Sequence, residues 1–528
     1  MDRQTLGSLP AAFAVIAGFG SFACTSQVLE LHPHDGLGGD AVNCEASLEW
    51  LPATPEPTLV TPPAHPAAEC GFYQTAYQYF LRATQPSASG DPAFAAFATG
   101  DDLFTGAQPL PAGALAPAGA HRGTALRAWL GDVKQPGGRQ LAIDQDGHSI
   151  YYGTHVNQGF VDFVNTNGLR TAAQIQNADP GLTFPPGVVA LRSAWKDIDA
   201  GDGVSGDFSA FVTTTAWVSR LHNDPVTGLI VEDKDRPRLI RVALLSLHVA
   251  FSLPGHPELI WTTFEHVDSR RMSDVAPIAW GDMNPDPGDP LNRRVTNPVS
   301  PSDLILYRGG TPTNQSNIPV SDALLALDET TQSFATTTSI YRVFAASRSE
   351  STTIPAEVRS LNDNVQALFQ ASAATLAGAD QRGAYALVGG IWMDKPGNFT
   401  VDSSLQNDSN SPFVTGSHVD QAGALVPAVP LVQLVNSLSI EGTDSPYSIV
   451  GGQDRLVGTA TESFDQAPGS FNNCMTCHNT QATSANGVPL LRDAGGAPLI
   501  APKLINVSHV FSRFVLEECG ASGVCPAP

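Results

Sequence analysis

The chain has 528 residues and a formal net charge of −23 at pH 7, and 42% of its residues are hydrophobic. This length predicts two to four domains or one large elaborated domain, and the negative charge excludes nucleic acid and anionic membrane surfaces as favourable partners. Charged residues make up only 15% of the chain, whereas glycine (48) and proline (41) are frequent. This composition indicates a loop-rich protein of largely β or mixed structure.

The N-terminal residues have the pattern of an export signal. Leu6 to Ala23 is uncharged and rich in small and apolar residues, but it is short and glycine-rich for a membrane span. We therefore predict a signal peptide over residues 1–23. Two outcomes at Cys24 stay equally open: ordinary cleavage before it, or lipidation of Cys24 as the first residue of a lipoprotein. Both predict a periplasmic or cell-surface protein, with membrane attachment only through a lipidated Cys24.

The seven cysteines fit an oxidising compartment. Cys44 and Cys70 flank a proline-rich stretch, and Cys519 and Cys525 flank five small or apolar residues. Each pair is spaced to close a disulfide, although two free pairs remain the alternative. Residues 24–70 show little periodicity and predict an extended proline-rich segment.

Residues 71–440 predict a β-rich main domain with several helices. Apolar residues at helical spacing predict a first helix over 72–81, whose aromatic stripe is interpreted as core, and an amphipathic helix over Glu357–Leu376. Residues 241–249 are apolar on both faces and predict a central strand. Strands are expected where β-branched and aromatic residues concentrate, at 149–156, 188–195, 208–218, 239–251, 258–267 and 385–393, with a short apolar element at 431–438.

Glu265 and His266 stand together near the end of the strand predicted at 258–267. Such a pair is able to carry out acid–base chemistry or to bind a metal. The alternative is a polar strand end in a hydrogen-bond network. The sequence shows no Ser/His/Asp arrangement, P-loop or dinucleotide-binding glycine motif, and we assign no catalytic residue.

The most specific pattern is Cys474-Met475-Thr476-Cys477-His478, which matches the C-x-x-C-H attachment sequence of a c-type haem. The two thiols form thioethers with one porphyrin, and the adjacent histidine then lies on the iron as proximal ligand. We predict one covalent haem c bound by Cys474, Cys477 and His478. Residues 441–528 would form a small, mainly helical haem segment.

No methionine follows His478, and Met475 lies between the two cysteines, where it cannot reach the opposite side of the ring. His509 is the only later histidine, at the start of a helix that Ser508 is suited to cap. We predict His478 and His509 as the two iron ligands. The alternative for His509 is a helix-start histidine bonded to backbone or water. Met393 and His418 are weaker candidates, and water or an empty position are further possibilities.

Two other uses of the cysteine motif are weaker. A thioredoxin-type dithiol needs a strand before it and a helix after it, and residues 451–473 do not suggest this arrangement. A structural zinc site needs further ligands, which Cys519 and Cys525 are able to supply. The export signal and the adjacent His478 favour haem.

Several segments together resemble a family of large exported bacterial proteins described as cytochrome c family proteins. The resembling blocks are 149–157, 191–196, 247–268, 474–478 and 506–509, scattered over residues 70–515. This resemblance implies one covalent haem c and electron transfer. It implies no substrate and no role for His509.

The sequence thus predicts an α+β protein with a β-rich main domain and a C-terminal haem segment. We expect an exported mono-haem c-type cytochrome that transfers electrons to a redox partner protein, its large remaining region binding that partner or a substrate. One alternative is a haem-dependent periplasmic oxidoreductase such as a peroxidase. Another is a surface lipoprotein scaffold in which the haem is structural.

Overall fold

The computed structural model describes residues 44–59, 69–104, 128–135, 140–199, 208–266, 303–321, 324–342, 356–372, 380–393, 458–465 and 503–519, with a few single residues and short stretches between 301 and 500. Several predictions lie outside the described residues: the signal peptide, Cys24, Cys477, Cys525 and the apolar element at 431–438.

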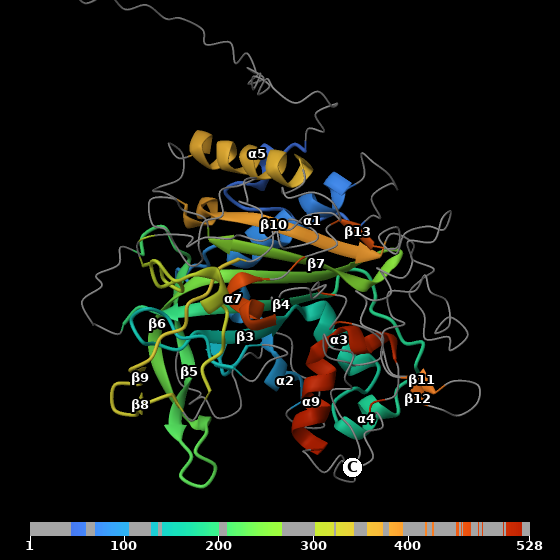
Figure 1. Ribbon diagram of the computed structural model, residues 1–528. Helices are drawn as coiled ribbons and strands as arrows, with labels where there is room; N and C mark the ends of the chain where they lie inside the picture. The colour runs from blue at the N-terminus through green and yellow to red at the C-terminus, as the bar shows by residue number, and fades with distance from the viewer. Residues whose placement is uncertain are drawn as a thin grey trace, which may run out of the picture. The chain divides into compact units, whose positions relative to one another are not determined.

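A nine-stranded sheet is the largest feature of the described part of the chain (Figure 1). Its strands follow the order β1-β3-β4-β6-β7-β10-β13, and β2 and β5 join it through β6. Their bounds are β1 Ala98–Thr99, β2 Ala128–Leu130, β3 Tyr151–Val156, β4 Val189–Asp197, β5 Thr213–Asn223, β6 Ile230–Leu253, β7 His256–His266, β10 Tyr385–Met393 and β13 Val450–Gly452. Two small strand pairs are β8 Leu327–Asp328 with β9 Ser333–Phe334, and β11 His418–Val419 with β12 Leu425–Val426.

Strand β6 organises the sheet. Its second half pairs with β4 on one side and β7 on the other, and its first half pairs with β5. Strand β5 pairs in parallel with β2, and Asp132, just after β2, bridges Tyr152 of β3. Strands β2, β3, β4, β6 and β5 therefore form a closed circuit, so the sheet is nearly a barrel. The prediction of a central strand within 239–251 is confirmed.

The helices are α1 Glu69–Thr84, α2 Gly100–Phe104, α3 Gln158–Thr166, α4 Ala172–Gln176, α5 Ala356–Ser372, α7 Thr459–Glu462 and α9 His509–Cys519, with short 3-10 turns that include η1 Leu48–Trp50 and η11 Leu504–Val507. Local sequence explains some helix starts. The Asn157 side chain accepts from the Phe160 N–H at the start of α3, and Thr171 and Gln174 form a capping box at α4. Within the described part of the chain, no helix is long and apolar enough to cross a membrane.

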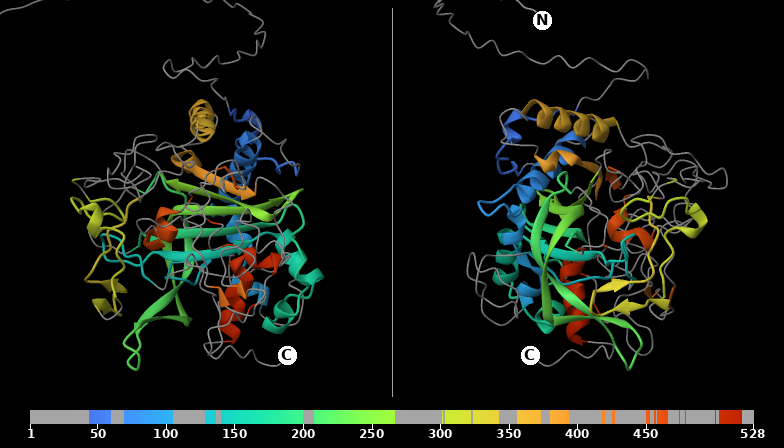
Figure 2. Two further views of the ribbon diagram at one scale, coloured as in Figure 1. Left: turned by 45° about the vertical axis from the view of Figure 1, so that its right-hand side comes forward. Right: turned by 90° about the vertical axis from the view of Figure 1, so that its left-hand side faces the viewer.

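Helices α1 and α5 cover one face of the sheet (Figure 2). The Phe80 ring of α1 stacks on Phe264 of β7 at 4.3 Å between centroids, and Tyr77 meets the same ring edge-on at 5.0 Å. The aromatic stripe predicted at 72–81 is therefore core, as expected. Residues 72–81, 357–372 and 385–393 adopt the predicted helices and strand.

Helices α3, α4 and α9 share a second hydrophobic cluster with strands β4 and β7. Phe511 of α9 is fully buried and stacks near Phe160 of α3 and Phe184. The described residues after 440 thus pack into the same cluster as residues before it. The mixed α+β class is confirmed, whereas the domain boundary at 440 and the mainly helical haem segment stay predictions.

Cys44 and Cys70 form a disulfide, with their Cα atoms 5.5 Å apart. This confirms the first predicted pair. Trp50, within the segment predicted as extended, is only 5% exposed and belongs to the core beneath α1. The described part of residues 24–70 is therefore tied to the main fold by both a disulfide and a buried ring.

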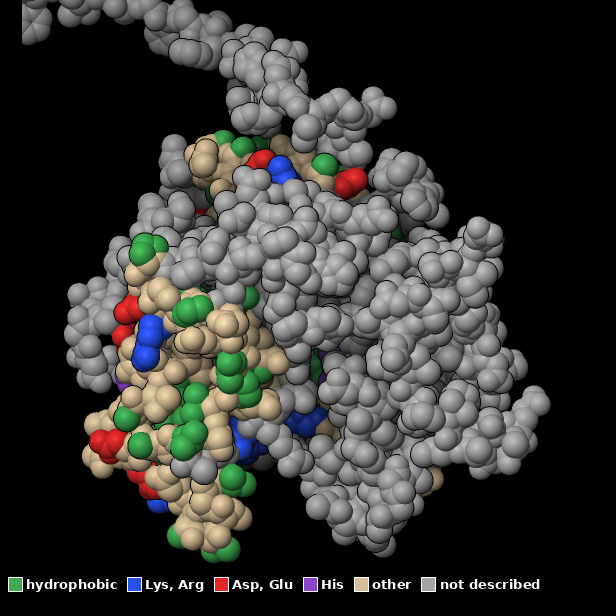
Figure 3. Space-filling model, in the orientation of Figure 1, with side chains coloured by type: hydrophobic (Ala, Val, Ile, Leu, Met, Phe, Trp, Pro, Cys, Tyr) green, Lys and Arg blue, Asp and Glu red, His purple; other side chains and the backbone are tan. Residues whose placement is uncertain are grey.

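The hairpin between β5 and β6 is an exposed edge rather than core. Val226 at its turn is 89% exposed, and Leu229 and Leu239 are also exposed. Gly228 adopts a φ of +68° in this turn, which only glycine tolerates easily. Figure 3 shows apolar side chains at the surface in the lower left, where Figure 1 places β5, β8 and β9.

Candidate functional site

One face of the sheet carries a set of polar and aromatic side chains beneath the C-terminal segment. Alternate residues of a strand point to the same face, and the register aligns Trp261 with Ala250, and Thr263 with His248. His248 is aligned in turn with Arg192 of β4. Trp261, Thr263 and Glu265 of β7 therefore share a face with His248 and Arg192.

The two described residues of the cysteine motif lie over this face. The His478 backbone N–H donates to the carbonyl of Cys474 at 2.8 Å. The two residues are four positions apart, which is the separation of the hydrogen bond in one α-helical turn. The Cys474 sulfur is partly buried against the second hydrophobic cluster and lies 3.8 Å from the Leu456 carbonyl oxygen. Cys477 lies outside the described residues.

A backbone carbonyl fixes the tautomer of His478. Its Nδ1 lies 2.8 Å from the carbonyl oxygen of Val507, which ends η11. Because a carbonyl only accepts, Nδ1 must carry the proton, and Nε2 keeps its lone pair. A metal-binding histidine is commonly held in this way, by donation from its second ring nitrogen.

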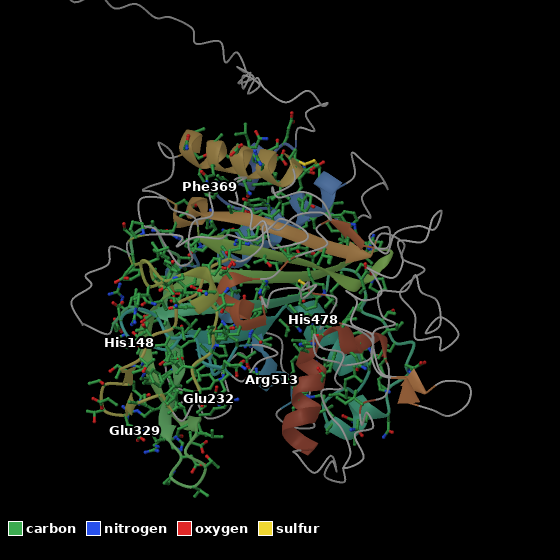
Figure 4. The ribbon with its side chains drawn as sticks, in the orientation of Figure 1. His148, Glu232, Glu329, Phe369, His478 and Arg513 are labelled. Atoms are coloured by element: carbon green, nitrogen blue, oxygen red, sulfur yellow. A yellow bond between two sulfur atoms is a disulfide. The ribbon has the colours of Figure 1, made fainter. Side chains whose placement is uncertain are left out.

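Two aromatic rings sandwich the His478 imidazole. The Trp261 ring lies 3.7 Å from it, at an interplanar angle of 29°, and the His509 ring lies 3.9 Å from it, at 26°. Both rings cannot stack on the same face at these distances without overlapping, so they lie on opposite faces. Figure 4 labels His478 beside the first turn of α9, where His509 begins the helix.

The surroundings of His478 keep its ring neutral. Burial is the largest cause that lowers its pKa, and the neighbouring His509 and His248 lower it further. The Val507 carbonyl opposes these effects, but the pKa stays well below its ordinary value. A neutral imidazole is the form that binds a metal.

Helix α9 is attached to the sheet by a charged cluster. Both terminal nitrogens of Arg513 donate to the Asp132 carboxylate, and Arg192 donates to it at 2.8 Å (Figure 4 labels Arg513). Burial of Asp132 would raise its pKa, but the charges of Arg513 and Arg192 outweigh burial and hold the pKa well below its usual value. This carboxylate is therefore ionised, and it fixes the position of α9 and of His509 at its start.

His248 is the centre of a second network, which the sequence did not indicate. Its Nδ1 lies 2.8 Å from the Thr263 hydroxyl, and its Nε2 lies 2.6 Å from the Thr461 hydroxyl and 2.9 Å from the Glu462 carboxylate. Burial lowers the pKa of His248, but Glu462 opposes this, and the net shift is upward. A Cβ on Gly458 would lie 2.5 Å from the His248 ring, so this close approach requires glycine.

Glu265 and His266 do not form one site. Glu265 accepts from Arg342 and from the Thr459 backbone N–H, at 2.6 Å for the latter, on the face that carries His248. His266 points to the other face, where its ring stacks on Phe211 at 3.6 Å. The pair proposed for acid–base or metal chemistry is therefore separated, because neighbouring residues of a strand face opposite ways.

The remaining candidates are less informative. Met393 ends β10 and His418 begins β11. Within the described ranges, no group of three or more histidine, cysteine or acidic side chains is placed to hold a metal ion. Two of the four cysteines of the zinc alternative, Cys477 and Cys525, lie outside these ranges.

The chain matches no model of a known protein family, no curated protein and no solved structure. The resemblance to cytochrome c family proteins therefore stays a prediction.

Proposed function

We propose that this protein is an exported mono-haem c-type cytochrome that transfers electrons, with Cys474, Cys477 and His478 holding one covalent haem. The observation that carries the proposal is the state of His478. Its Nδ1–H is used by the Val507 carbonyl, which leaves the Nε2 lone pair available on a neutral ring. This state belongs to a residue that directly follows the second cysteine of a C-x-x-C-H sequence.

The donors and surroundings at the site also fit a haem. Cys474 is partly buried against an apolar cluster, as a cysteine bonded to a porphyrin edge would be. The indole N–H of Trp261 is buried and has no hydrogen-bond partner among the described residues. A haem carries carboxylates that such a donor is able to bond. A buried polar atom without a partner needs a physical explanation, and a haem carboxylate at this position would supply one.

The chain contributes by orienting the His478 ring and by burying the site. The Val507 carbonyl and the ring of Trp261 fix the rotation of His478, and the surrounding apolar cluster excludes water. A bound haem supplies a one-electron Fe(II)/Fe(III) couple, whose potential depends on axial ligation, hydrogen bonding and burial. The protein would exchange this electron with an unidentified redox partner protein.

Export is supported by the Cys44–Cys70 disulfide, because such bonds persist in oxidising compartments. Attachment of a c-type haem outside the cytoplasm is consistent with the signal peptide predicted over residues 1–23. Any membrane attachment would depend on lipidation of Cys24.

The proposal is tested by producing the mature protein through a haem-maturing export pathway. We expect its mass to include one covalent haem, and we expect one reversible haem couple in a potentiometric titration. Cys474→Ala should lose a thioether, and His478→Ala should lose the native spectrum. Cys519→Ala is the matched control and should keep the haem. Wild-type protein without covalent haem would disprove the proposal. If the wild-type protein contains zinc instead, and both Cys474→Ala and Cys519→Ala lose it, the cysteines form a zinc site.

A peroxidase is a second candidate that one observation favours. His509 lies against the face of the His478 ring rather than beyond its Nε2 edge, so the position opposite His478 is not held by His509 in this arrangement. Rapid binding of cyanide to the resting ferric protein, with turnover of peroxide, would support this candidate. An inert six-coordinate iron would argue against it.

A further inference from the structure

The position of His509 is informative about its role toward His478. A metal binds an imidazole through a nitrogen lone pair that lies in the plane of the ring. Metal–nitrogen bonds are about 2.0–2.1 Å long, so the nitrogens of two axial histidines lie about 4 Å apart and their ring centroids farther apart. The rings of His478 and His509 are instead stacked, with centroids 3.9 Å apart.

The side of the iron on which His509 stands follows from this stacking. Since Nδ1 of His478 is bonded to Val507, a metal would lie in the ring plane beyond Nε2. A group stacked on the face of the ring is level with the ring itself. It therefore stands on the same side of such a metal as His478, with the ring of Trp261 on the other face.

His509 is not free to cross to the other side without moving its helix. Phe511, two residues later, is fully buried beside Phe160 and Phe184. Arg513, one turn later, is bound to Asp132 of the closed strand circuit. These contacts hold the first turn of α9 in the stacked arrangement.

We propose that His509 is a positioning residue for the proximal ligand and not the sixth ligand of the iron. This inference rests on the proposed function, because it requires haem on His478. Together with Trp261, His509 holds the imidazole of His478 at one rotation about its bond to the metal. The sixth position is then left to water, an external ligand or another group of the chain.

The test compares His509→Ala with His509→Phe in haem-loaded full-length protein, by optical and EPR spectra of the ferric form and by redox titration. Phenylalanine keeps a flat ring against His478 but has no nitrogen to bind iron. We expect His509→Phe to keep the wild-type spin state and potential. His509→Ala should keep the spin state but shift the potential and the EPR signal. Trp261→Leu should shift them as well.

The control is Phe514→Leu, which removes a ring from the same helix. That ring stacks on Phe104 at 4.0 Å and not on His478, so spectrum and potential should not change. If both His509 variants turn a low-spin iron into a high-spin one, His509 is the ligand and the inference fails. Both variants matching wild type in every property would equally overturn it. Wild-type protein without haem would instead reject the proposed function. If His509→Ala does not fold, the spectra and potentials of His509→Phe and Trp261→Leu test the role of His509.

Discussion

At the scale of single residues, His155 shows how burial dominates the pKa of a histidine. It lies on β3, on the face covered by α1, and is fully buried, with the Phe94 ring edge-on at 5.2 Å. Neither ring nitrogen has a hydrogen-bond partner within the described residues. Burial disfavours the charged ring and lowers the pKa of His155 to about 4, and the charge of Arg192 acts in the same direction.

This shift predicts a loss of stability in mild acid. The unfolded chain binds a proton at His155 near pH 6.5, but the folded protein does so only near pH 4. The stabilising contribution is therefore complete above pH 6.5 and is lost as the pH falls to about 4. Its size is on the order of 3 kcal/mol. Urea unfolding of wild type and His155→Phe over this range should give a flatter pH profile for the variant; parallel profiles would refute the assignment.

Single candidate site residues were predictable where the proposed chemistry depends on local spacing. Cys474, His478 and His509 follow from the motif and from the few later candidates, and the structure brings the two histidine rings together. Trp261 was not predictable, because its contact with His478 joins residues 217 positions apart, which no local pattern records. The network around His248 was not predictable either, because a single histidine in an apolar strand produces no periodic pattern.

At the scale of elements, the first turn of α9 depends on one carboxylate. Asp132 neutralises Arg192 and Arg513, whose side chains are 16% and 35% exposed. Asp132→Asn would remove the carboxylate that both guanidinium groups contact, with Glu232 as a remaining carboxylate that acts on Arg513. We expect a loss of about 3 kcal/mol in the free energy of unfolding, the lower end for a broken buried pair, because Arg513 is partly in water.

Hydrogen exchange separates this local effect from general destabilisation. In Asp132→Asn, amides of residues 509–519 should lose protection before those of β4 and β6. Arg513→Gln cuts the same link to α9, so it should also lose protection over residues 509–519, with a smaller loss of stability because the Asp132–Arg192 pair stays intact. Arg192→Gln is the matched control: it keeps the Asp132–Arg513 pair, so protection over residues 509–519 should be kept. Uniform loss of protection across the sheet in Asp132→Asn would contradict an anchoring role.

Helices and strands were predictable where buried positions form a pattern of apolar residues in the sequence. Tyr385–Met393 matches β10 at both ends, since the apolar run starts directly after the Gln381–Ala384 turn and is followed by a charged residue, Asp394. The first half of β6 was missed: residues 231–238 are mostly charged or polar, and they pair with β5 in an exposed hairpin rather than in the core. Backbone pairing across a hairpin edge needs no apolar pattern, so hydrophobic periodicity does not report it.

At the scale of the whole molecule, the arrangement of the C-terminal segment depends on packing between distant parts of the chain. The second hydrophobic cluster joins strands β4 and β7 and helices α3 and α4 to residues after 440. Those later residues include Leu456, Ile500, Leu504, Ile505, Val507, Phe511 and Val515. Neither the closed strand circuit nor this shared cluster could be predicted, because both depend on which strands and side chains meet at long range. Composition indicated only a largely β or mixed structure, and the mixed α+β class followed from the helices and strands that local periodicity predicted.

This shared cluster makes a prediction about the domain boundary at residue 440. Burial of these seven apolar side chains after 440 contributes on the order of 10 kcal/mol, which is comparable to the whole stability of a typical domain. A protein spanning residues 24–440 should therefore not unfold cooperatively, and it should bind a hydrophobic dye. The protein spanning 24–528 is the control, measured by urea unfolding under the same conditions. Cooperative unfolding of the shorter protein at a similar midpoint would show instead that residues 441–528 form an independent unit, and that the site on β7 is assembled by docking.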